Sequence, residues 1–338
     1  MHVLLTGGSG FIASYVLHSL VERGHTAVVT VRSQEKADLI KSNYPTLTKD
    51  ALDFAIVPEL SVPGAFDAAI QSSASSFDAV LHTASPLNLS LIDPQKDVLD
   101  PAIIGTTTLL KSVAKFAPTV KRVVILSSFA AMVNEVQGDW PEHTYTTADW
   151  NPISNEEALV DVIAAYRGSK TFAERAAWDF MEHEKPSFTL TTLLPPFVYG
   201  PVVRYPNTPL AAPNASNRRF LALLQGASFP TAFYAWIDVR DCALGIVKAM
   251  EQESAAGERI FLTSSEQFSN QDIVQIISDE FPEYAEKLPP RSEWEVLGYP
   301  EGGVYKVDAG RARSLLDKNF VSLSKSVVDT VSSLRALV

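Results

Sequence analysis

Short apolar runs alternate with longer amphipathic stretches through the first part of the chain. Runs rich in valine, isoleucine and leucine stand at residues 2–6, 26–31, 53–57, 77–82, 122–127 and 188–194. Helical patterns fill residues 11–22, about 98–116 and about 156–183. Continuous apolar strands separated by helices are typical of a parallel sheet that is covered on both faces. The pattern predicts an α/β fold, a doubly wound parallel sheet of the Rossmann type.

The residue composition of the chain changes after Gly200. Residues 201–216 carry four prolines and two asparagines, which predicts a long loop. A seventh strand is expected at 259–263, with helices near 270–280, 308–317 and 324–336. We therefore expect a dinucleotide-type Rossmann domain over 1–200, with a strand and a helix from about 237–263. A smaller C-terminal, substrate-binding lobe is expected from 201–236 and 264–338.

Composition and charge narrow the function classes. Apolar residues make up 46% and charged residues 20%, as in ordinary globular proteins. No apolar run approaches the roughly 20 residues that span a bilayer, and the start of the chain lacks the pattern of a signal peptide. The net charge of -11 argues against a nucleic-acid backbone or an anionic membrane surface as partner. We expect a cytoplasmic protein with no nucleic-acid or membrane partner.

Cysteine and histidine usage points away from thiol and metal chemistry. The single cysteine, Cys242, excludes an internal disulfide and lies in an apolar helical stretch, which favours a buried thiol. None of the six histidines has metal-ligand spacing, so no metal is expected. We interpret His82 as a structural residue.

A glycine-rich turn follows the first predicted strand and opens the first predicted helix. Glycines there permit a tight turn and a close approach of the backbone to a pyrophosphate, which the helix N-terminus stabilises. Its position in a first βαβ unit favours a dinucleotide site over an ordinary strand-to-helix turn. The residues concerned are Gly7, Gly8, Ser9, Gly10, Phe11 and Ile12.

The end of the second predicted strand indicates which dinucleotide binds. NAD-binding proteins usually place an acid there, to bond the ribose 2′-hydroxyl. This chain has Arg32 instead, with Lys36 one helical turn further on. An arginine fork suits the geometry of a 2′-phosphate, so we predict NADP(H), although a solvated basic pair is the alternative.

Tyr166 and Lys170 stand four residues apart on a predicted helix, and therefore on one face. A nearby lysine cation favours the phenolate and moves the tyrosine pKa toward neutrality, which suits proton transfer to a carbonyl oxygen. Ser127 and Ser128 end the fifth predicted strand, where doubly wound folds bind ligands. Strand neighbours point to opposite faces, so only one serine can serve, and the pattern does not say which. A core aromatic and a surface lysine would be the alternative.

These stretches together resemble the extended short-chain dehydrogenase/reductases, NAD-dependent epimerase/dehydratase-like proteins. The chain looks most like the fungal NADPH-dependent aldehyde and ketone reductases, with dihydroflavonol and cinnamoyl-CoA reductases as relatives. The shared stretches are 10–13, 31–36, 81–86, 166–170, 172–178, 199–201 and 237–241.

The resemblance implies roles for individual residues. Ser128 would be the catalytic serine, Tyr166 the acid, and Lys170 the group that binds the nicotinamide ribose and lowers the tyrosine pKa. Glu59 and Leu60 would flank the adenine, and Val198 would lie near the nicotinamide. The remaining implied cofactor contacts are Thr83, Ala84, Ser85, Pro195 and Ser216.

The chain departs from the family pattern at several positions. Glu59 stands where an aspartate is usual, and Leu126 precedes the serine pair where a threonine is common. Leu87 and Phe129 occupy pocket positions that are often aromatic, and Phe197 is a third implied pocket residue. An aromatic cluster at 229–236 favours lobe core over pocket wall, although it can line an apolar pocket.

The expected activity is the reduction of an aldehyde or ketone to an alcohol with NADPH. A nucleotide-sugar epimerase or dehydratase on the same fold is one alternative, but such enzymes normally retain NAD, against which Arg32 argues. A non-catalytic dinucleotide-sensing protein is another, against which the tyrosine–lysine pair argues. A small-molecule carbonyl compound is the expected substrate, and the protein is expected to be a monomer or a homodimer.

Overall fold

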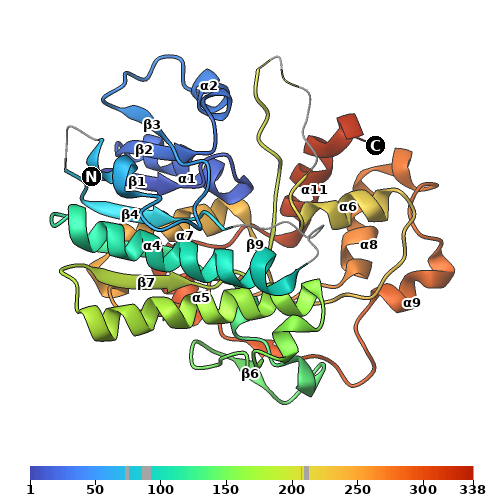
Figure 1. Ribbon diagram of the computed structural model, residues 1–338. Coiled ribbons are helices and arrows are strands. Elements are labelled where there is room, and N and C mark those ends of the chain that lie inside the picture. Colours follow the sequence, from blue (N-terminus) through green and yellow to red (C-terminus); the bar gives the residue numbers. More distant parts are fainter. Residues whose placement is uncertain (73–75, 86–92, 207, 209–212, 338) are drawn as a thin grey trace. The chain divides into compact units, whose positions relative to one another are not determined.

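The computed structural model describes residues 1–337 apart from 73–75, 86–92, 207 and 209–212 (Figure 1). The chain divides into two compact units. The first unit comprises Met1–Asn134, Thr147–Leu194 and Ile246–Ile260. The second unit comprises Glu135–Thr146, Pro195–Gly245 and Phe261–Val338. Among the described residues, no helix combines the length and apolar character needed to cross a membrane.

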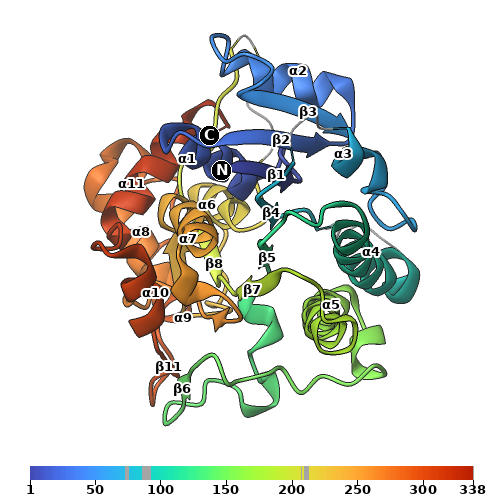
Figure 2. The same cartoon turned by 90° about the vertical axis from the view of Figure 1, so that its left-hand side faces the viewer.

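A seven-stranded sheet forms the centre of the first unit, in the order β10-β7-β5-β4-β1-β2-β3 (Figure 2). Every pairing between these strands is parallel. The strand order reverses between β1 and β4, and at such a point doubly wound folds open a crevice at the strand ends. The strands are β1 (His2–Thr6), β2 (Thr26–Val31), β3 (Leu52–Ile56), β4 (Ala79–His82), β5 (Arg122–Leu126), β7 (Thr189–Leu193) and β10 (Arg259–Ile260).

Helices cover both faces of this sheet. Helices α4 (Asp100–Phe116) and α5 (Val162–Glu184) lie side by side on one face, and α1 (Phe11–Glu22) lies on the other (Figure 2). Helices α2 (Gln34–Ser42) and α3 (Asp67–Gln71) follow β2 and β3. Apolar side chains from helices and strands share one core, which includes Leu4, Val80, Leu109, Leu110, Val113, Val123, Ala177 and Phe180.

Single turns of helix complete the first unit. A π-helical turn, Gln95–Leu99, leads directly into α4. The 3₁₀ turns are η2 (Phe129–Ala131), η4 (Glu157–Leu159) and η5 (Glu253–Ala255).

The predicted α/β class and doubly wound parallel sheet are confirmed. The predicted helices and strands differ from the observed ones chiefly in their ends, whereas short elements are absent from the predictions, such as β6 (Thr144–Tyr145), β8 (Phe197–Tyr199), β9 (Trp236–Asp238) and β11 (Lys306–Val307). Helix α5 begins at Val162, because the Asp161 carboxylate accepts hydrogen bonds from the amides of Ile163 and Ala164, both at 2.8 Å. Such capping by an aspartate starts a helix. The helical pattern before it belongs to the separate turn η4, so the predicted start at 156 is wrong.

The second unit contains two small parallel strand pairs. Strand β8 (Phe197–Tyr199) pairs with β9 (Trp236–Asp238), and β6 (Thr144–Tyr145) pairs with β11 (Lys306–Val307). Its helices are α6 (Asn217–Leu224), α8 (Asn270–Glu280), α9 (Trp294–Leu297), α10 (Gly310–Leu316) and α11 (Leu323–Leu334). Its 3₁₀ turns are η3 (Glu135–Gln137), η6 (Pro282–Tyr284), η7 (Arg291–Glu293) and η8 (Arg335–Leu337). Helix α7 (Val239–Glu251) begins in the second unit and ends in the first.

Aromatic side chains dominate the core of the second unit. Tyr199, Phe220, Trp236 and Phe268 are each fully buried there. Tyr234 is also buried, so two members of the predicted aromatic cluster, Tyr234 and Trp236, are core residues. The described residues of 201–216 lie outside helices and strands, as the proline-rich sequence predicts.

Candidate active site

A tight glycine turn joins the end of β1 to the start of α1. Gly7 has a φ of +76°, a left-handed conformation that favours glycine. A Cβ atom on Gly7 would lie 2.8 Å from Cα of Ala84, and one on Gly8 would lie 2.0 Å from Cγ1 of Val29. Neither position accepts a side chain, so the turn packs closely against β2 and the segment that follows β4.

Helix α1 begins directly after this turn, with Gly10 as its N-cap. The amides of Phe11 and Ile12 belong to the first turn of the helix, where amides have no partner within the helix. The first turn contains no acidic residue, so nothing in it opposes the positive end of the helix dipole. The turn is therefore a suitable binding site for a phosphate group.

A groove of about 370 Å³ opens beside the glycine turn, at the ends of β1, β2, β3 and β4. This volume is in the range of cofactor sites, and the position is the crevice expected of a doubly wound sheet. Polar residues that line the groove are Ser9, Thr30, Arg32, Ser33, Lys36, Thr83 and Ser85. Other lining residues are Gly7, Gly10, Val31, Val57, Leu60, Phe66 and Ala84.

Two cations stand on the wall of the groove that follows β2. Arg32 is exposed and comes directly after the strand. Ser33 caps α2, with its hydroxyl accepting a hydrogen bond from the amide of Lys36 at 3.4 Å. This cap places Lys36 in the first turn of α2, where it lines the same groove as Arg32. The pair has the charge and the donor geometry for a phosphate.

The two predicted adenine-flanking residues, Glu59 and Leu60, follow β3. Leu60 lines the groove. The carboxylate of Glu59 accepts hydrogen bonds from the hydroxyl and the amide of Ser61, at 2.6 and 2.9 Å. These two bonds, helped by the nearby Arg32, lower the pKa of Glu59. Glu59 is therefore an anion held in its own turn.

The segment after β4 forms the opposite wall of the groove. Thr83 donates a hydrogen bond from its hydroxyl to the carbonyl of Thr6 at 2.6 Å, and the amide of Ala84 donates to the Thr6 hydroxyl at 3.2 Å. These bonds hold the segment against the end of β1. Thr83, Ala84 and Ser85 all line the groove, whereas Leu87 lies outside the described residues.

The two serines at the end of β5 have different partners. The Ser128 hydroxyl lies 3.4 Å from the phenol oxygen of Tyr166, which donates to it, and also accepts from the amide of Ala130 at 3.1 Å. The Ser127 hydroxyl donates to a carboxylate oxygen of Glu174 at 2.7 Å. The structure thus turns Ser128 toward Tyr166, which answers the question that the sequence pattern leaves open.

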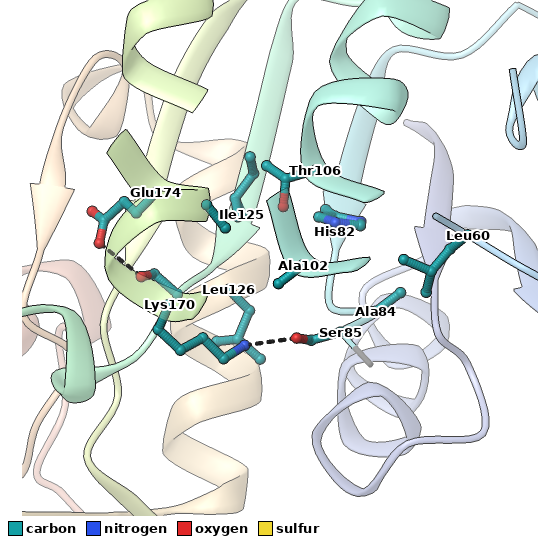
Figure 3. A pocket seen from close by; sticks show the side chains of 12 residues that line it. Leu60, His82, Ala84, Ser85, Ala102, Thr106, Ile125, Leu126, Lys170 and Glu174 are labelled. Atoms are coloured by element: carbon teal, nitrogen blue, oxygen red, sulfur yellow. Dashed lines mark hydrogen bonds between the residues drawn. The ribbon is translucent and has the colours of Figure 1, made fainter. Parts of the chain in front are cut away.

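Lys170 projects from α5 toward the segment that follows β4 (Figure 3). Its ammonium donates to the hydroxyl of Ser85 at 2.9 Å and lies 5.9 Å from the ring centroid of Tyr166. Burial lowers the pKa of Lys170 to about 8, and the carboxylate of Glu174 opposes that shift. The ammonium is still mostly protonated at neutral pH.

The ionisation of Tyr166 differs from the expectation. Lys170 is expected to lower the tyrosine pKa, but in the structure the pKa of Tyr166 is raised. Burial of the phenol is the larger effect, and the hydrogen bond to Ser128 opposes it only in part. The Lys170 ammonium is bonded to Ser85 rather than to the phenol oxygen. Tyr166 therefore stays protonated near neutrality, which is the state of a proton donor.

His82 lies at the end of β4 and lines a small cavity that Lys170 and Glu174 also line (Figure 3). Its Nδ1 shares a hydrogen bond with the hydroxyl of Thr6 at 2.8 Å. Burial, with a smaller effect of the Lys170 charge, lowers the pKa of His82 to about 3. A neutral, bonded imidazole agrees with a structural role.

The remaining predicted residues fall in two places. Phe129 begins η2 in the first unit and is 1% exposed. Pro195, Phe197, Val198 and Ser216 belong to the second unit, with Phe197 and Val198 in β8 and Ser216 directly before α6. The roles of these residues stay predictions.

Some residues of the site are absent from the sequence-based predictions. Val57 and Phe66 line the groove but resemble core residues in sequence, and only the fold places them there. Ser33 also lines it, and a serine before a helical pattern is a recognisable cap signal. Glu174 and Arg259 lie on separate elements, and no spacing in the sequence links them.

Thiol and metal chemistry find no support in the described residues. Cys242 is fully buried, and burial raises the pKa of its thiol. Within the described part of the chain, no group of three or more His, Cys, Asp or Glu side chains is arranged to hold a metal ion.

The Rossmann sheet, the glycine turn and the Ser128–Tyr166–Lys170 set are the features of an extended short-chain dehydrogenase/reductase. Residues 3–262 match the NAD dependent epimerase/dehydratase family. The chain belongs to this family.

Similar proteins of this family are named as reductases. Ketoreductase azaE of Aspergillus niger is 41% identical, over 98% of this chain and 97% of that protein. The structure of the yeast methylglyoxal/isovaleraldehyde reductase Gre2 complexed with NADPH has a TM-score of 0.90 at 30% identity, covering 99% of this chain and 98% of that chain. The structure of Gre2 in complex with NADPH from Candida albicans has a TM-score of 0.90 at 33% identity, covering 99% of both chains.

Proposed function

We propose that this protein reduces an aldehyde or ketone to the corresponding alcohol with NADPH. The observation that carries the proposal is the hydrogen bond between Tyr166 and Ser128, at 3.4 Å, after β5 and so at the same carboxyl edge of the sheet as the groove of the glycine turn. A protonated phenol and a serine hydroxyl that face each other provide two groups for one carbonyl oxygen.

The residues of the groove fit NADPH. A Cβ atom on Gly7 or Gly8 would collide with Ala84 or Val29, so no side chain fills the space at these two positions of the turn. Arg32 and Lys36 supply cations for the phosphate that distinguishes NADPH from NADH. When bound, NADPH supplies the hydride.

Side chains of this protein would bind the carbonyl oxygen of the substrate and protonate it. Ser128 would donate a hydrogen bond that orients the carbonyl, and Tyr166 would donate its phenolic proton to the oxygen. One hydride on the carbon and one proton on the oxygen give the alcohol. Lys170, mostly cationic near neutrality, would stabilise the phenolate that remains.

The similar proteins support carbonyl reduction rather than epimerisation. Their names specify a ketoreductase and methylglyoxal or isovaleraldehyde reductases, two of them solved with NADPH. Arg32 at the end of β2 favours the phosphorylated cofactor for this chain as well. We further propose that the substrate is a small carbonyl compound. We also propose that the protein acts in the cytoplasm, as a monomer or a homodimer.

Replacement of the proposed acid tests the proposal. Tyr166→Phe removes the proton and keeps the ring, so kcat/KM against a panel of aldehydes and ketones should fall about 10²-fold or more. NADPH affinity, measured by fluorescence titration, should change little. Tyr299→Phe, at a tyrosine that is 44% exposed in the second unit, is the matched control and should keep full activity. A fully active Tyr166→Phe variant, or a wild-type protein that oxidises NADPH with no member of the panel, would overturn the proposal.

A further inference from the structure

A buried carboxylate lies one helical turn beyond Lys170. The Glu174 side chain is 1% exposed. One of its oxygens accepts from the Ser127 hydroxyl at 2.7 Å. The other accepts from the Thr192 hydroxyl and from Nε of Arg259, both at 2.8 Å. A buried charge with three donors from three strand ends is a built feature rather than a surface ion pair.

The arginine in this cluster is itself tied to the chain around the active site. Arg259 donates from its guanidinium to the carbonyls of Thr147 and Asp149, and more weakly to that of Ala131 at 3.3 Å. Its guanidinium carbon lies 3.8 Å from the ring centroid of Trp150. The guanidinium is therefore held by hydrogen bonds along its edges and by the Trp150 ring on a face.

The cluster controls the backbone that carries the proposed catalytic serine. Ser127 precedes Ser128 in the chain, and Ala131 follows it by three residues. The Glu174–Arg259 pair therefore makes hydrogen bonds on both sides of Ser128, to the Ser127 hydroxyl and to the Ala131 carbonyl. Glu174 also shares α5 with Tyr166 and Lys170, so its three hydrogen bonds tie that helix to the strands beside it. Glu174 therefore contacts the elements that carry both partners of the Tyr166–Ser128 hydrogen bond, α5 and the segment after β5.

The charge of Glu174 acts on Lys170 as well. Both side chains line the same small cavity (Figure 3). Among the described residues, the polar groups that line this cavity with Lys170 are Glu174 on α5, His82 and Ser85 at and after the end of β4, Thr106 on α4 and Ser127 after β5. The Tyr166 ring also lies near the Lys170 ammonium. His82 is neutral and Tyr166 is protonated near neutrality, so Glu174 is the anion of this set. It counteracts the effect of burial on the pKa of Lys170.

We propose that Glu174 is a positioning residue of the active site, which holds Ser128 and Tyr166 in register and places a carboxylate in the cavity that Lys170 lines. The inference rests on the proposed function, and it adds the Glu174–Arg259 pair to the reduction machinery. A carboxylate that only stabilised the fold would affect the amount of folded protein and leave the titration of Lys170 unchanged.

Variants that change one charge distinguish a positioning role of Glu174 from a purely stabilising one. The measured quantity is the direction in which the alkaline midpoint of kcat/KM moves. Glu174→Gln keeps the shape and removes the negative charge, so the alkaline midpoint of kcat/KM should fall by about one pH unit. Arg259→Gln removes the cation that offsets Glu174, so the midpoint should rise. Thr192→Val removes a neutral hydrogen bond to the same carboxylate and is the matched control, with an unchanged midpoint. Thermal unfolding of each variant reports the stability change separately.

A direct titration of Lys170 makes the test independent of turnover. The pH dependence of Lys170 acetylation by acetic anhydride, followed by peptide mass spectrometry, should show the same downward and upward shifts. A midpoint that does not move in Glu174→Gln, or that moves in the same direction in Glu174→Gln and Arg259→Gln, would overturn the inference. Should Glu174→Gln fail to fold, Arg259→Gln decides alone, and an unchanged or lowered midpoint contradicts the inference. A wild-type protein that reduces no carbonyl compound would defeat the proposed function, whereas the labelling shifts would still decide the role of Glu174.

Discussion

The adjacent residues Ser127 and Ser128 have different roles in this account, one structural and one proposed to be catalytic. Both serines follow β5 and both contact α5, but Ser127 reaches Glu174 while Ser128 reaches Tyr166, two helical turns earlier on α5. The residue types alone predict that one serine is useful but not which one. The sequence does predict the tyrosine–lysine pair, because both lie on one helix at a fixed spacing. It does not predict the raised pKa of Tyr166, which depends on burial by distant parts of the chain.

Arg32 and Lys36 are predicted to determine the preference for NADPH over NADH. Arg32→Ala combined with Lys36→Ala removes both cations from the groove wall, so the ratio of kcat/KM for NADPH over NADH should fall about 10- to 100-fold. Lys49→Ala, at an exposed lysine that pairs with Asp53, is the control and should leave the ratio unchanged. Steady-state kinetics with both cofactors gives the ratio. A wild-type ratio near or below one would contradict the assignment of Arg32 and Lys36.

The titration of Lys170 predicts the pH dependence of the wild-type reaction. Burial lowers its pKa to about 8, so the cation is present below that pH and is lost as the pH rises through it. Tyr166, with its raised pKa, remains protonated over the same interval. We expect kcat/KM for carbonyl reduction to be flat near neutrality and to fall above about pH 8. A pH–rate profile that still rises at pH 9.5 would contradict this account.

At the scale of elements, the β1 turn and the start of α1 form the most predictable part of the site. Apolar periodicity predicts the long strands because each is buried on both faces of a covered sheet. The same signal fails for β8 and β9, whose three residues each are too few to show a period. It also misplaces the start of α5, since a 3₁₀ turn and a capped helix share one continuous pattern. Asp161 is one of several polar residues in that stretch, and the pattern alone does not show which of them caps the helix.

The glycine turn yields a prediction about close packing. A methyl group on Gly8 would lie 2.0 Å from Cγ1 of Val29, so Gly8→Ala must displace the turn or the strand. Overpacking of this kind costs about 1–3 kcal/mol, and we expect a lower melting temperature and at least about 10-fold weaker NADPH binding. The double variant Gly8→Ala with Val29→Ala removes the obstructing methyl group and should recover part of both losses. Unchanged NADPH affinity in Gly8→Ala alone would show that the turn does not hold the cofactor.

At the scale of the whole molecule, the chain combines a Rossmann unit with a second unit assembled from distant segments. The first unit carries the groove and the Ser128–Tyr166–Lys170 set, and its sequence motifs are local enough to be predicted. Glu174 and Arg259 are 85 residues apart and meet only because β7 and β10 pair. The second unit combines 135–146, 195–245 and 261–338, and long-range contacts of that kind leave no short motif in the sequence. The assignment of that unit to substrate binding stays a prediction.

Transfer of a hydride to a carbonyl carbon is the central claim, and isotope transfer measures it most directly. The protein would be incubated with NADPH carrying deuterium at both C4 positions and with an aldehyde or ketone that it consumes. We predict one deuterium at the carbinol carbon of each alcohol molecule, detected by mass spectrometry, and almost none with Tyr166→Phe over the same time. Alcohol formed without deuterium, or NADPH oxidised without formation of alcohol, would contradict the account.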